Sequence, residues 1–354
     1  MAQRIRGLFE KMISDEVLRQ AVAQMTAGKK AKKKRNRRLV EDPDKCIAEA
    51  KAAALDPSWE PHSYFIRDYY DVVCKKWRKL ATPRACPEGI LMTAMEIVMQ
   101  PIVVSRIPPT CCGSIRGRGN LYAIKQVQRC LKYHKASKHY VVLDAKKFYP
   151  TTNMDWFCNT VFPKLFHDER FCALHTKFIK RYGNGLPIGS PFSHLDADLY
   201  VSHAYLYWLD TQGVRYVNFA DDTFICAPSK RKLRNVIVPG VMERLAALGQ
   251  ELHDGRNTKQ ITEKEGVRFL GRVIWEDHCL LKKSTLFVIS RKARQAGFNP
   301  SPKQARSLEA RLGLLKRTNS YNFKKKWVDP FVSEKMIRRI ISDDSKTGAR
   351  RNCG

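Results

Sequence analysis

The stretch RYVNFADDTFIC, from Arg215 to Cys226, decides how the rest of the chain is interpreted. β-Branched and aromatic residues flank Asp221 and Asp222, which predicts two short strands with both carboxylates at the bend. Adjacent carboxylates repel each other and require cations, and hard oxygen ligands suit Mg²⁺. An Asp pair alone is weak evidence, because Asp343-Asp344 forms another pair in a polar tail, where we expect both side chains to be solvated.

A third carboxylate strengthens this interpretation. His139 to Asp144, HYVVLD, is an apolar run that ends in an acid, which is typical of a buried strand with the acid at its C-terminal tip. Asp144 and Asp221 are 77 residues apart (221 − 144), and adjacent strands would bring them together. Two divalent ions held ~4 Å apart by such carboxylates can deprotonate a hydroxyl and neutralise a leaving phosphate, as nucleotidyl transfer requires. The alternative is that these residues only cap turns.

The composition indicates a folded protein with a polyanionic partner. Apolar residues make up 44% of the 354 residues, and 65 Lys and Arg against 34 Asp and Glu give a net charge of +31. Nucleic acid is the first candidate partner, because each neutralised phosphate releases counterions, and an anionic membrane is the alternative. No apolar run approaches the ~20 residues of a spanning helix, and the N-terminal MAQRIRGLFEK lacks the apolar core of a signal peptide.

Cysteine and histidine spacing gives no metal motif. The eleven Cys contain no CxxC pair, and we expect free thiols in a reducing compartment. The nine His show no HxxxH spacing, so no zinc site is assigned.

Two basic segments are candidates for contact with a nucleic-acid backbone. Residues 29–38, KKAKKKRNRR, contain eight basic residues in ten, and we expect a loop that binds nucleic acid through Lys32, Lys33, Lys34 and Arg35. A solvated mobile loop or a nuclear-localisation segment are the alternatives. The second segment is 113–120, GSIRGRGN, whose glycines allow close approach to phosphates beside Arg116 and Arg118.

Periodicity predicts an α+β protein in which an antiparallel sheet carries the acids. We expect one hairpin with a cationic face within 68–84 and another at 267–275. Helices are expected at 9–27, 44–55, 88–100, 121–133, 154–166, 168–182, 193–209 and 229–248. Prolines are expected to break two of these helices. The helix at 88–100 should end near Pro101, and the helix at 229–248 should be interrupted at Pro239-Gly240. From about residue 280 the chain should be helical and basic and end in a polar tail.

The order of motifs resembles that of reverse transcriptases, from about Lys75 to Trp275. LDAKKFYP is similar to the first catalytic block, and FADD stands where the family usually has Tyr-x-Asp-Asp. GLPIGSPFSHLDADLYV resembles the block against the template and incoming base pair, GQELHDGRNTKQI the basic block, and FLG the primer-grip turn. The resemblance implies a right-hand polymerase with an N-terminal helix, basic loop and fingers in 1–138, a palm in 139–274 with residual fingers helices at 154–182, and a small helical thumb with a basic tail in 275–354.

The resemblance also implies roles for individual residues. Asp144 and Asp221 would ligate two Mg²⁺ ions, or Mn²⁺, with help from the Ala145 carbonyl, and Asp222 would lie nearer the primer end. Tyr149 matches the aromatic steric gate that excludes a ribose 2′-hydroxyl, and a core aromatic is the alternative. The other matches on the nucleotide side are Arg78 of the fingers, the turn Ile188-Gly189, and either Arg256 or Lys259 for pyrophosphate departure.

Within the family, the chain most resembles the reverse transcriptases of diversity-generating retroelements of bacteria and phages. The similar features are the Ile-Gly-x-x-x-Ser core at 188–193, the N-terminal helix followed by a basic segment, the Arg-x-x-Gly-type loop, and FLGRVIWEDHCLLKKS. Such enzymes use dNTPs to copy a template RNA into cDNA, with errors at template adenines, alongside a basic accessory protein. This likeness implies a cytoplasmic protein of a bacterium or of a phage-infected cell.

Three departures leave other systems open. His194 replaces the Gln that usually follows Ser193, Phe219 replaces Tyr, and Cys86-Pro87-Glu88-Gly89 stands where the fingers usually carry Lys and Arg. These changes spare the metal site but fall in regions that bear on fidelity. The alternative is therefore an antiphage-defence reverse transcriptase that works with a non-coding RNA. A non-catalytic RNA-binding scaffold is more distant, because it would not need three acids on like-charged strand tips.

Overall fold

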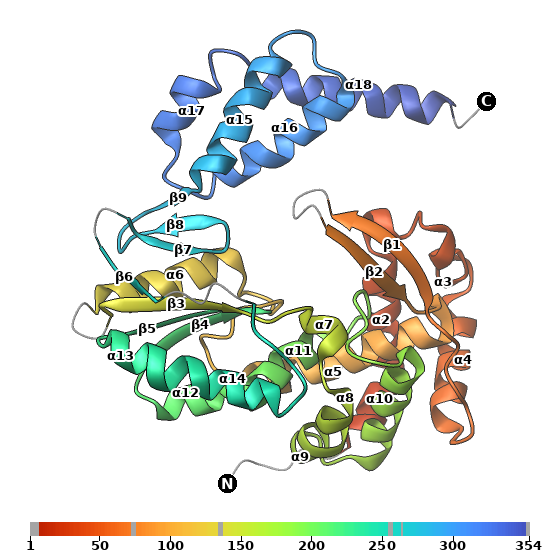
Figure 1. The fold of residues 1–354 in the computed structure, drawn as a ribbon. Helices are drawn as coiled ribbons and strands as arrows, with labels where there is room; N and C mark the ends of the chain where they lie inside the picture. The colour runs from red at the N-terminus through yellow and green to blue at the C-terminus, as the bar shows by residue number, and fades with distance from the viewer. Residues whose placement is uncertain (1–6, 72–75, 134–136, 254–257, 263–264, 352–354) are drawn as a thin grey trace.

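The computed structural model describes residues 7–71, 76–133, 137–253, 258–262 and 265–351. It confirms the predicted α+β class. Helices surround a four-stranded antiparallel sheet, a two-stranded hairpin projects at one side, and a helical bundle lies beyond a three-stranded sheet at the C-terminal end (Figure 1). We call these parts the palm sheet (β4-β5-β3-β6), the fingers hairpin (β1-β2) and the thumb (α15 to α18).

The palm sheet explains the apolar runs in the sequence. Its strands are Arg215–Phe219 (β4), Asp222–Ala227 (β5), His139–Asp144 (β3) and Lys259–Gln260 (β6). β3 and β5 pair antiparallel along their whole lengths, from His139 opposite Ala227 to Asp144 opposite Asp222. Alternate residues of these strands belong to two different core clusters, so both faces of the sheet are buried and nearly every position is apolar.

Helices cover the two faces of the palm sheet (Figure 1). One face packs against Asn120–Lys132 (α6), whose buried stripe includes Ala123, Ile124 and Val127. The opposite face packs against Ser193–Val201 (α11), Tyr207–Thr211 (α12) and Val238–Ala246 (α14), and Lys230–Lys232 (α13), which has no buried residue, precedes α14. The π-helical turns Ser202–Leu206 and Leu233–Ile237 join these helices without a break.

The N-terminal helices pack around one long buried helix, Ile90–Arg106 (α5). They are Leu8–Met12 (α1), Asp15–Thr26 (α2), Arg37–Glu41 (α3) and Pro43–Leu55 (α4). Ser14 caps α2, because its Oγ accepts a hydrogen bond from the Val17 amide at 3.4 Å.

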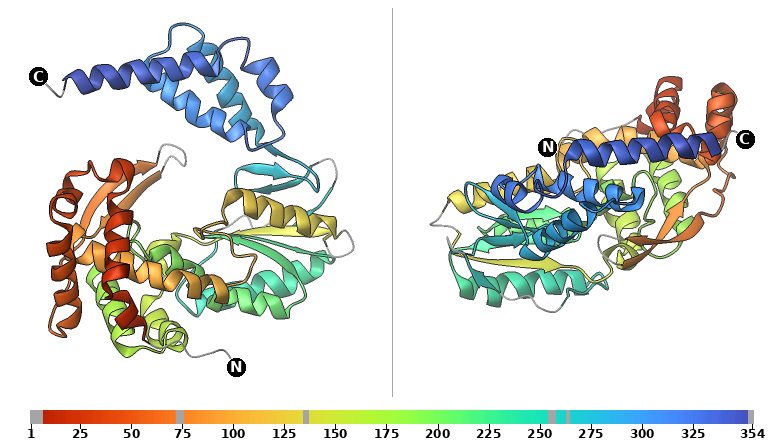
Figure 2. Two further views of the ribbon diagram at one scale, coloured as in Figure 1. Left: turned by 180° about the vertical axis from the view of Figure 1, so that it is seen from behind. Right: turned by 90° about the horizontal axis from the view of Figure 1, so that it is seen from above.

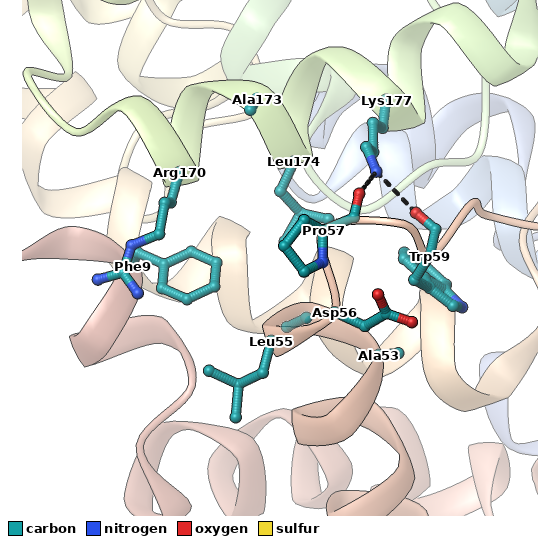
Figure 3. A pocket seen from close by; sticks show the side chains of 11 residues that line it. Phe9, Ala53, Leu55, Asp56, Pro57, Trp59, Arg170, Ala173, Leu174 and Lys177 are labelled. Carbon is teal, nitrogen blue, oxygen red and sulfur yellow. Dashed lines mark hydrogen bonds between the residues drawn. The ribbon is translucent and has the colours of Figure 1, made fainter.

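A second helical group joins the N-terminal helices to the palm. It comprises Phe148–Thr151 (α7), Met154–Trp156 (α8), Phe162–Leu165 (α9) and Glu169–Tyr182 (α10). The Lys177 ammonium group of α10 donates to the carbonyls of Pro57 and Trp59 at 2.7 and 2.8 Å, and the Arg170 guanidinium lies 4.5 Å over the Phe9 ring. These contacts border a cavity of about 180 Å³ (Figure 3). The cavity lies between scaffold helices and holds none of the predicted site residues.

The fingers hairpin and the three-stranded sheet confirm both predicted hairpins. Phe65–Asp71 (β1) and Lys76–Thr82 (β2) pair antiparallel, and Lys76 lies opposite Asp71. Val267–Phe269 (β7) and Arg272–Ile274 (β8) form the second hairpin, and Cys279–Leu281 (β9) adds a third strand that was not predicted.

The thumb has its own hydrophobic core. Its helices are Lys283–Ala296 (α15), Pro302–Leu315 (α16), Tyr321–Trp327 (α17) and Glu334–Arg351 (α18). Leu308, Leu312 and Leu315 of α16 are buried at the predicted helical spacing. The view from behind places the thumb beyond the three-stranded sheet, and the view from above shows α18 pointing toward the side of the molecule that carries the N-terminal helices (Figure 2).

Both helix breaks that were predicted at prolines were wrong. α5 continues through Pro101 to Arg106, because Val98, Met99 and Val103 on the same helix are at most 2% exposed and their packing outweighs one lost backbone hydrogen bond. Pro239 is the second residue of α14, directly after a π-helical turn, where a missing N–H costs little. The segment 230–246 is therefore continuous.

The predicted loop and polar tail are also more ordered than expected. The basic segment forms two short 3₁₀ turns, Gly28–Lys30 and Lys34–Asn36, because the buried Asn36 amide donates to the carbonyls of Met25 and Lys30 at 2.7 and 3.1 Å. The C-terminal tail forms α18, in which Asp344 is ion-paired with Arg306. Asp343 remains a largely solvated surface carboxylate.

The expectation that no segment matches a spanning helix was also wrong. Residues Ala85–Arg106 are long and apolar enough to cross a membrane by length and composition. However, 61% of their apolar window is buried inside the protein, so packing in the core accounts for the apolar residues. The nine cysteines within the described residues are free, as predicted.

Candidate active site

Asp144, Asp221 and Asp222 come together at one end of the palm sheet. Asp144 ends β3 and Asp222 begins β5, and they are directly opposite partners in the antiparallel ladder. Such partners have Cβ atoms ~4.5–5.5 Å apart. Asp221 is the exposed residue of the turn before β5, and its carbonyl accepts a hydrogen bond from the amide of Ala145 at 3.4 Å. This backbone hydrogen bond therefore links the segment that carries Asp144 to the segment that carries Asp221 and Asp222.

The buried Asn218 holds the turn that presents Asp221. Its Nδ2 donates to the carbonyl of Ala220 and to the hydroxyl of Thr223, both at 2.9 Å. Ala220 has φ 53°, a left-handed conformation that costs a non-glycine residue ~1–2 kcal/mol. The Asn218 hydrogen bonds offset this cost, and they fix the direction in which Asp221 leaves the turn.

The three carboxylates form an electrostatically strained cluster. Burial, followed by the charge of Asp221, raises the pKa of Asp144. Burial, followed by the charges of Asp221 and Asp144, raises the pKa of Asp222 to about 7. His253 and Lys76 lower the pKa of Asp144, and Lys282 lowers that of Asp222, but the net shift of both carboxyl groups is upward. The protein's own cations therefore leave part of the negative charge uncompensated.

The three acids are suited to divalent cations that are coordinated partly by the protein and partly by a bound substrate. In the part of the chain that the structure describes, no group of three or more His, Cys, Asp or Glu side chains forms a complete metal-binding set. Mg²⁺ is usually bound by one or two carboxylates together with waters and substrate phosphates, so a complete protein cage is not required. Asp144 and Asp221 would hold the ions, next to the backbone of Ala145, and Asp222 lies beside them.

Three of the predicted nucleotide-side residues, Arg78, Ile188 and Gly189, lie where the fingers hairpin contacts the turn at Ile188. The Ala81 amide of β2 donates to the Ile188 carbonyl at 2.7 Å, and a Cβ on Gly189, where φ is +112°, would lie 2.9 Å from the Ala81 oxygen. This close contact attaches the fingers hairpin, with Arg78 three residues before Ala81, to the turn at Ile188. The role of these residues toward a nucleotide stays a prediction.

Tyr149 belongs to the same group. Burial and the charges of Asp198 and Asp221 raise the pKa of Tyr149 to about 12, whereas Arg78 opposes the rise. Its ring is half-buried and packs edge-on against Phe148, with centroids 5.6 Å apart. The charges of Asp221 and Arg78 thus both act on Tyr149, and its role as a steric gate stays a prediction.

A buried carboxyl behind the turn was missed by the sequence analysis. Asp198 of α11 is 2% exposed, the Cys111 thiol lies 3.5 Å from its Oδ1, and burial raises its pKa well above the ordinary value. Gly113 fits between this carboxyl and the turn, because an added Cβ would lie 2.8 Å from the Ala220 nitrogen and 3.1 Å from Asp198 Oδ1. The glycine-rich segment therefore approaches the catalytic turn at this residue.

Lys259 is not brought to the acids. It pairs with Tyr140, four residues before Asp144, which corresponds to ~13 Å along the strand. Its suggested role in pyrophosphate departure has no geometric support, and the alternative, Arg256, lies outside the described residues. Lys76, His253 and Lys282 are the basic side chains that act on the carboxylates. Lys282 could have been noticed, since it lies within the recognised FLGRVIWEDHCLLKKS, but nothing in the sequence marked its position in space.

The predicted nucleic-acid residues fall in two places. Lys32, Lys33, Lys34 and Arg35 are exposed, and Arg35 is close enough to Arg67 of β1 for that charge, after burial, to lower its pKa. This basic segment therefore lies beside the fingers hairpin. Arg116 is exposed, but the half-buried Arg118 donates to the carbonyls of Pro108 and Cys111 at 3.2 and 2.8 Å and fixes a turn.

The site is that of a polymerase palm, and a family comparison identifies the class. The model of the reverse transcriptase (RNA-dependent DNA polymerase) family matches residues 62–274, which are 213 of the 354 residues (274 − 62 + 1). The chain therefore belongs to the reverse transcriptase family. The matched segment contains all three acids and every predicted nucleotide-side residue.

Among solved structures, the chain is similar to two telomerases. One is telomerase from Candida albicans in complex with the TWJ fragment of telomeric RNA, with 8% identity, a TM-score of 0.48, and coverage of 83% of this chain and 59% of that chain. The other is apo telomerase from Candida tropicalis, with 10% identity, a TM-score of 0.46, and coverage of 77% and 60%. The chain spans about three fifths of the length of these telomerase chains. No curated protein matches the chain.

Proposed function

We propose that the protein is an RNA-directed DNA polymerase that extends a primer on an RNA template by two-metal nucleotidyl transfer. The observation that carries this proposal is the convergence of Asp144, Asp221 and Asp222 at one end of the palm sheet, with an uncompensated negative charge. A scaffold that only bound RNA would gain nothing from this cluster, because like charges held together destabilise a fold.

The residues have distinct tasks in the reaction. The primer 3′-hydroxyl attacks the α-phosphorus of a dNTP and passes its proton to water as the new P–O bond forms, and pyrophosphate leaves as the old P–O bond breaks. Asp144 and Asp221 would hold the two divalent ions, which would supply charge neutralisation and lower the pKa of the attacking hydroxyl. Asp222 lies on the primer side, Arg78 neutralises triphosphate charge, and Tyr149 occupies the space that a ribose 2′-hydroxyl would need.

For the biological system we propose a diversity-generating retroelement, in the cytoplasm of a bacterium or a phage-infected cell. The support is the Ile-Gly-x-x-x-Ser core at 188–193 and the basic N-terminal segment beside the fingers hairpin. Its partners would be a dedicated template RNA, the cDNA or primer, dNTPs and a basic accessory protein. Phe219 and His194 favour a second candidate, an antiphage-defence reverse transcriptase with a non-coding RNA, since both replace residues typical of the retroelement enzymes.

Two experiments test the proposal. The first is extension of a DNA primer on an RNA template with Mg²⁺ and dNTPs, which the wild type should catalyse and Asp221→Ala should not. Equal product from both proteins, or none from either with varied primers, refutes the polymerase. The second is sequencing of the cDNA made on the co-purified RNA. Substitutions concentrated at template adenines support the retroelement, whereas accurate or homopolymeric product contradicts it.

A further inference from the structure

A large basic cavity lies along the outer edge of the palm sheet, away from the catalytic turn. Its volume is about 860 Å³, and its walls come from the end of α5, the turn at Pro108-Pro109, α6, α12 and the start of β4. Arg215 in this wall precedes Asp221 by six residues along β4, which corresponds to roughly 20 Å of extended strand. The cavity is therefore a separate site on the palm.

Its charge is strongly positive. The wall contains five basic residues, Arg106, Arg118, Arg129, Lys132 and Arg215, against one acid, Asp210. Asp210 is already engaged, because its Oδ1 accepts a hydrogen bond from the Tyr216 hydroxyl at 2.7 Å. Among the described residues, no carboxylate forms an ion pair with Arg118, Arg129, Lys132 or Arg215, although the chain's other basic side chains form many such pairs. Four cations that share one concave wall repel each other unless an anion joins them.

An aromatic ring lies among these cations. The Tyr133 side chain is 56% exposed, and the Arg215 guanidinium stacks over its ring at 3.9 Å from the centroid. An exposed tyrosine with a stacked arginine is a platform on which a nucleobase can also stack, and such platforms typically accompany cations that follow a nucleic-acid backbone. An acidic protein segment would bind the cations, but it has no nucleobase to stack on the exposed ring.

The cavity is also connected to the catalytic strand. Arg118 fixes the turn at 108–111 through the carbonyls of Pro108 and Cys111, and that turn pairs with β4, because the Asn218 amide donates to the Thr110 carbonyl at 2.9 Å. Asn218 holds the Ala220 turn in front of Asp221. A ligand that binds the cavity thus contacts the same strand that presents a catalytic acid.

We propose that this cavity is a second RNA-binding site, which holds backbone phosphates of the partner RNA through Arg129, Lys132 and Arg215 with a base stacked at Tyr133. This inference rests on the proposed function, since a template-bearing RNA is the polyanion that such a polymerase already carries. The site would anchor a part of that RNA outside the template–primer duplex.

The test compares two triple variants with the same change in net charge. The test variant is Arg129→Ala/Lys132→Ala/Arg215→Ala, and the matched control is Lys230→Ala/Arg231→Ala/Arg234→Ala, three exposed cations of the palm helices that line none of the cavities described above. The probe is a fluorescein-labelled RNA hairpin, titrated by anisotropy in excess unlabelled short template–primer duplex to occupy the catalytic site. Thermal unfolding checks that both variants are folded.

We expect the test variant to bind the hairpin roughly tenfold to hundredfold more weakly than wild type at about 0.1 M salt, because each lost single-strand phosphate contact reduces the salt slope by about 0.7. The slope of log K against log salt should therefore become less steep by about 2, whereas the control changes little. Equal losses in the two variants overturn the proposal. Unchanged hairpin binding with weakened binding of polyglutamate also overturns it, in favour of an acidic protein partner. Failure of the polymerase itself would appear separately, as equal extension by wild type and Asp221→Ala.

Discussion

Replacing Asp221 by Asn should stabilise the protein in metal-free buffer while abolishing polymerisation. The rise in the pKa of Asp222 from 3.8 to about 7 corresponds to about 4 kcal/mol against its ionised form, since each pKa unit is worth about 1.4 kcal/mol. Burial is the larger cause and persists in the variant, so we assign the charge of Asp221 the lower end of the Coulomb range for two charges ~4 Å apart, about 1 kcal/mol. An unfolding entropy of about 2.1 cal/mol/K per residue converts this into a Tm increase of about 1 °C for 354 residues.

The pH dependence gives this prediction a second measurement. Because the folded-state pKa of Asp222 lies above its unfolded value, the folded protein binds the extra proton between about pH 4 and pH 7, and its stability falls as the pH rises through that range. Differential scanning fluorimetry in EDTA should show a smaller loss of Tm between pH 6 and pH 8 for Asp221→Asn than for wild type. Mg²⁺ at tenfold its Kd should then stabilise wild type by about 1.4 kcal/mol, and the variant by less.

The second Asp pair supplies the control for this experiment. Asp343→Asn removes one carboxylate of an adjacent pair on α18, and it should change neither the pH dependence nor the response to Mg²⁺. A lower Tm for Asp221→Asn than for wild type in EDTA at pH 8, or an equal Mg²⁺ response of the two proteins, would refute the inference that the three acids form a strained cation site.

Three other substitutions test neighbouring parts of the site. Asn218→Ala should lower the free energy of unfolding by about 2–3 kcal/mol and primer extension by at least about tenfold, because it removes the hydrogen bonds of its Nδ2 to Ala220 and Thr223. Wild-type extension would show that Asn218 does not position Asp221. Gly113→Ala should reduce extension because its Cβ would lie 2.8 Å from the Ala220 nitrogen, whereas Gly313→Ala, with open space around its Cβ, should not; equal rates would contradict this. Tyr149→Ala should raise ribonucleotide incorporation relative to deoxynucleotides, and unchanged selectivity in a single-nucleotide assay would remove Tyr149 from its steric role.

The features that local chemistry determines could be predicted from the sequence. Strands β3 and β5 were recognisable because both faces are buried and their residues are almost all apolar, and the acids at their tips followed directly. Each acid stands at the end of its strand, and this position already implied a register in which Asp144 lies opposite Asp222.

Features that depend on tertiary packing could not be predicted. Pro101 should end a helix by local rules, but buried neighbours keep α5 intact. Asn218 has the sequence context of an ordinary strand residue, and only the fold shows that its amide faces the turn. Asp198 and Lys282 are distant in sequence from Tyr149 and Asp222, the residues whose pKa they shift, and Lys259 was assigned by alignment, whereas the fold places it opposite Tyr140.

The most direct test of the central claim is the rate of single-nucleotide incorporation by Asp144→Asn on a preformed RNA template–DNA primer, with Asp343→Asn as the matched control. Charge neutralisation by metal ions is worth several kcal/mol, so we expect Asp144→Asn to be slower than wild type by at least about a thousandfold at saturating Mg²⁺, and Asp343→Asn to match wild type. If Asp144→Asn incorporated the nucleotide at the wild-type rate, the three acids at the end of the palm sheet would not be the catalytic centre.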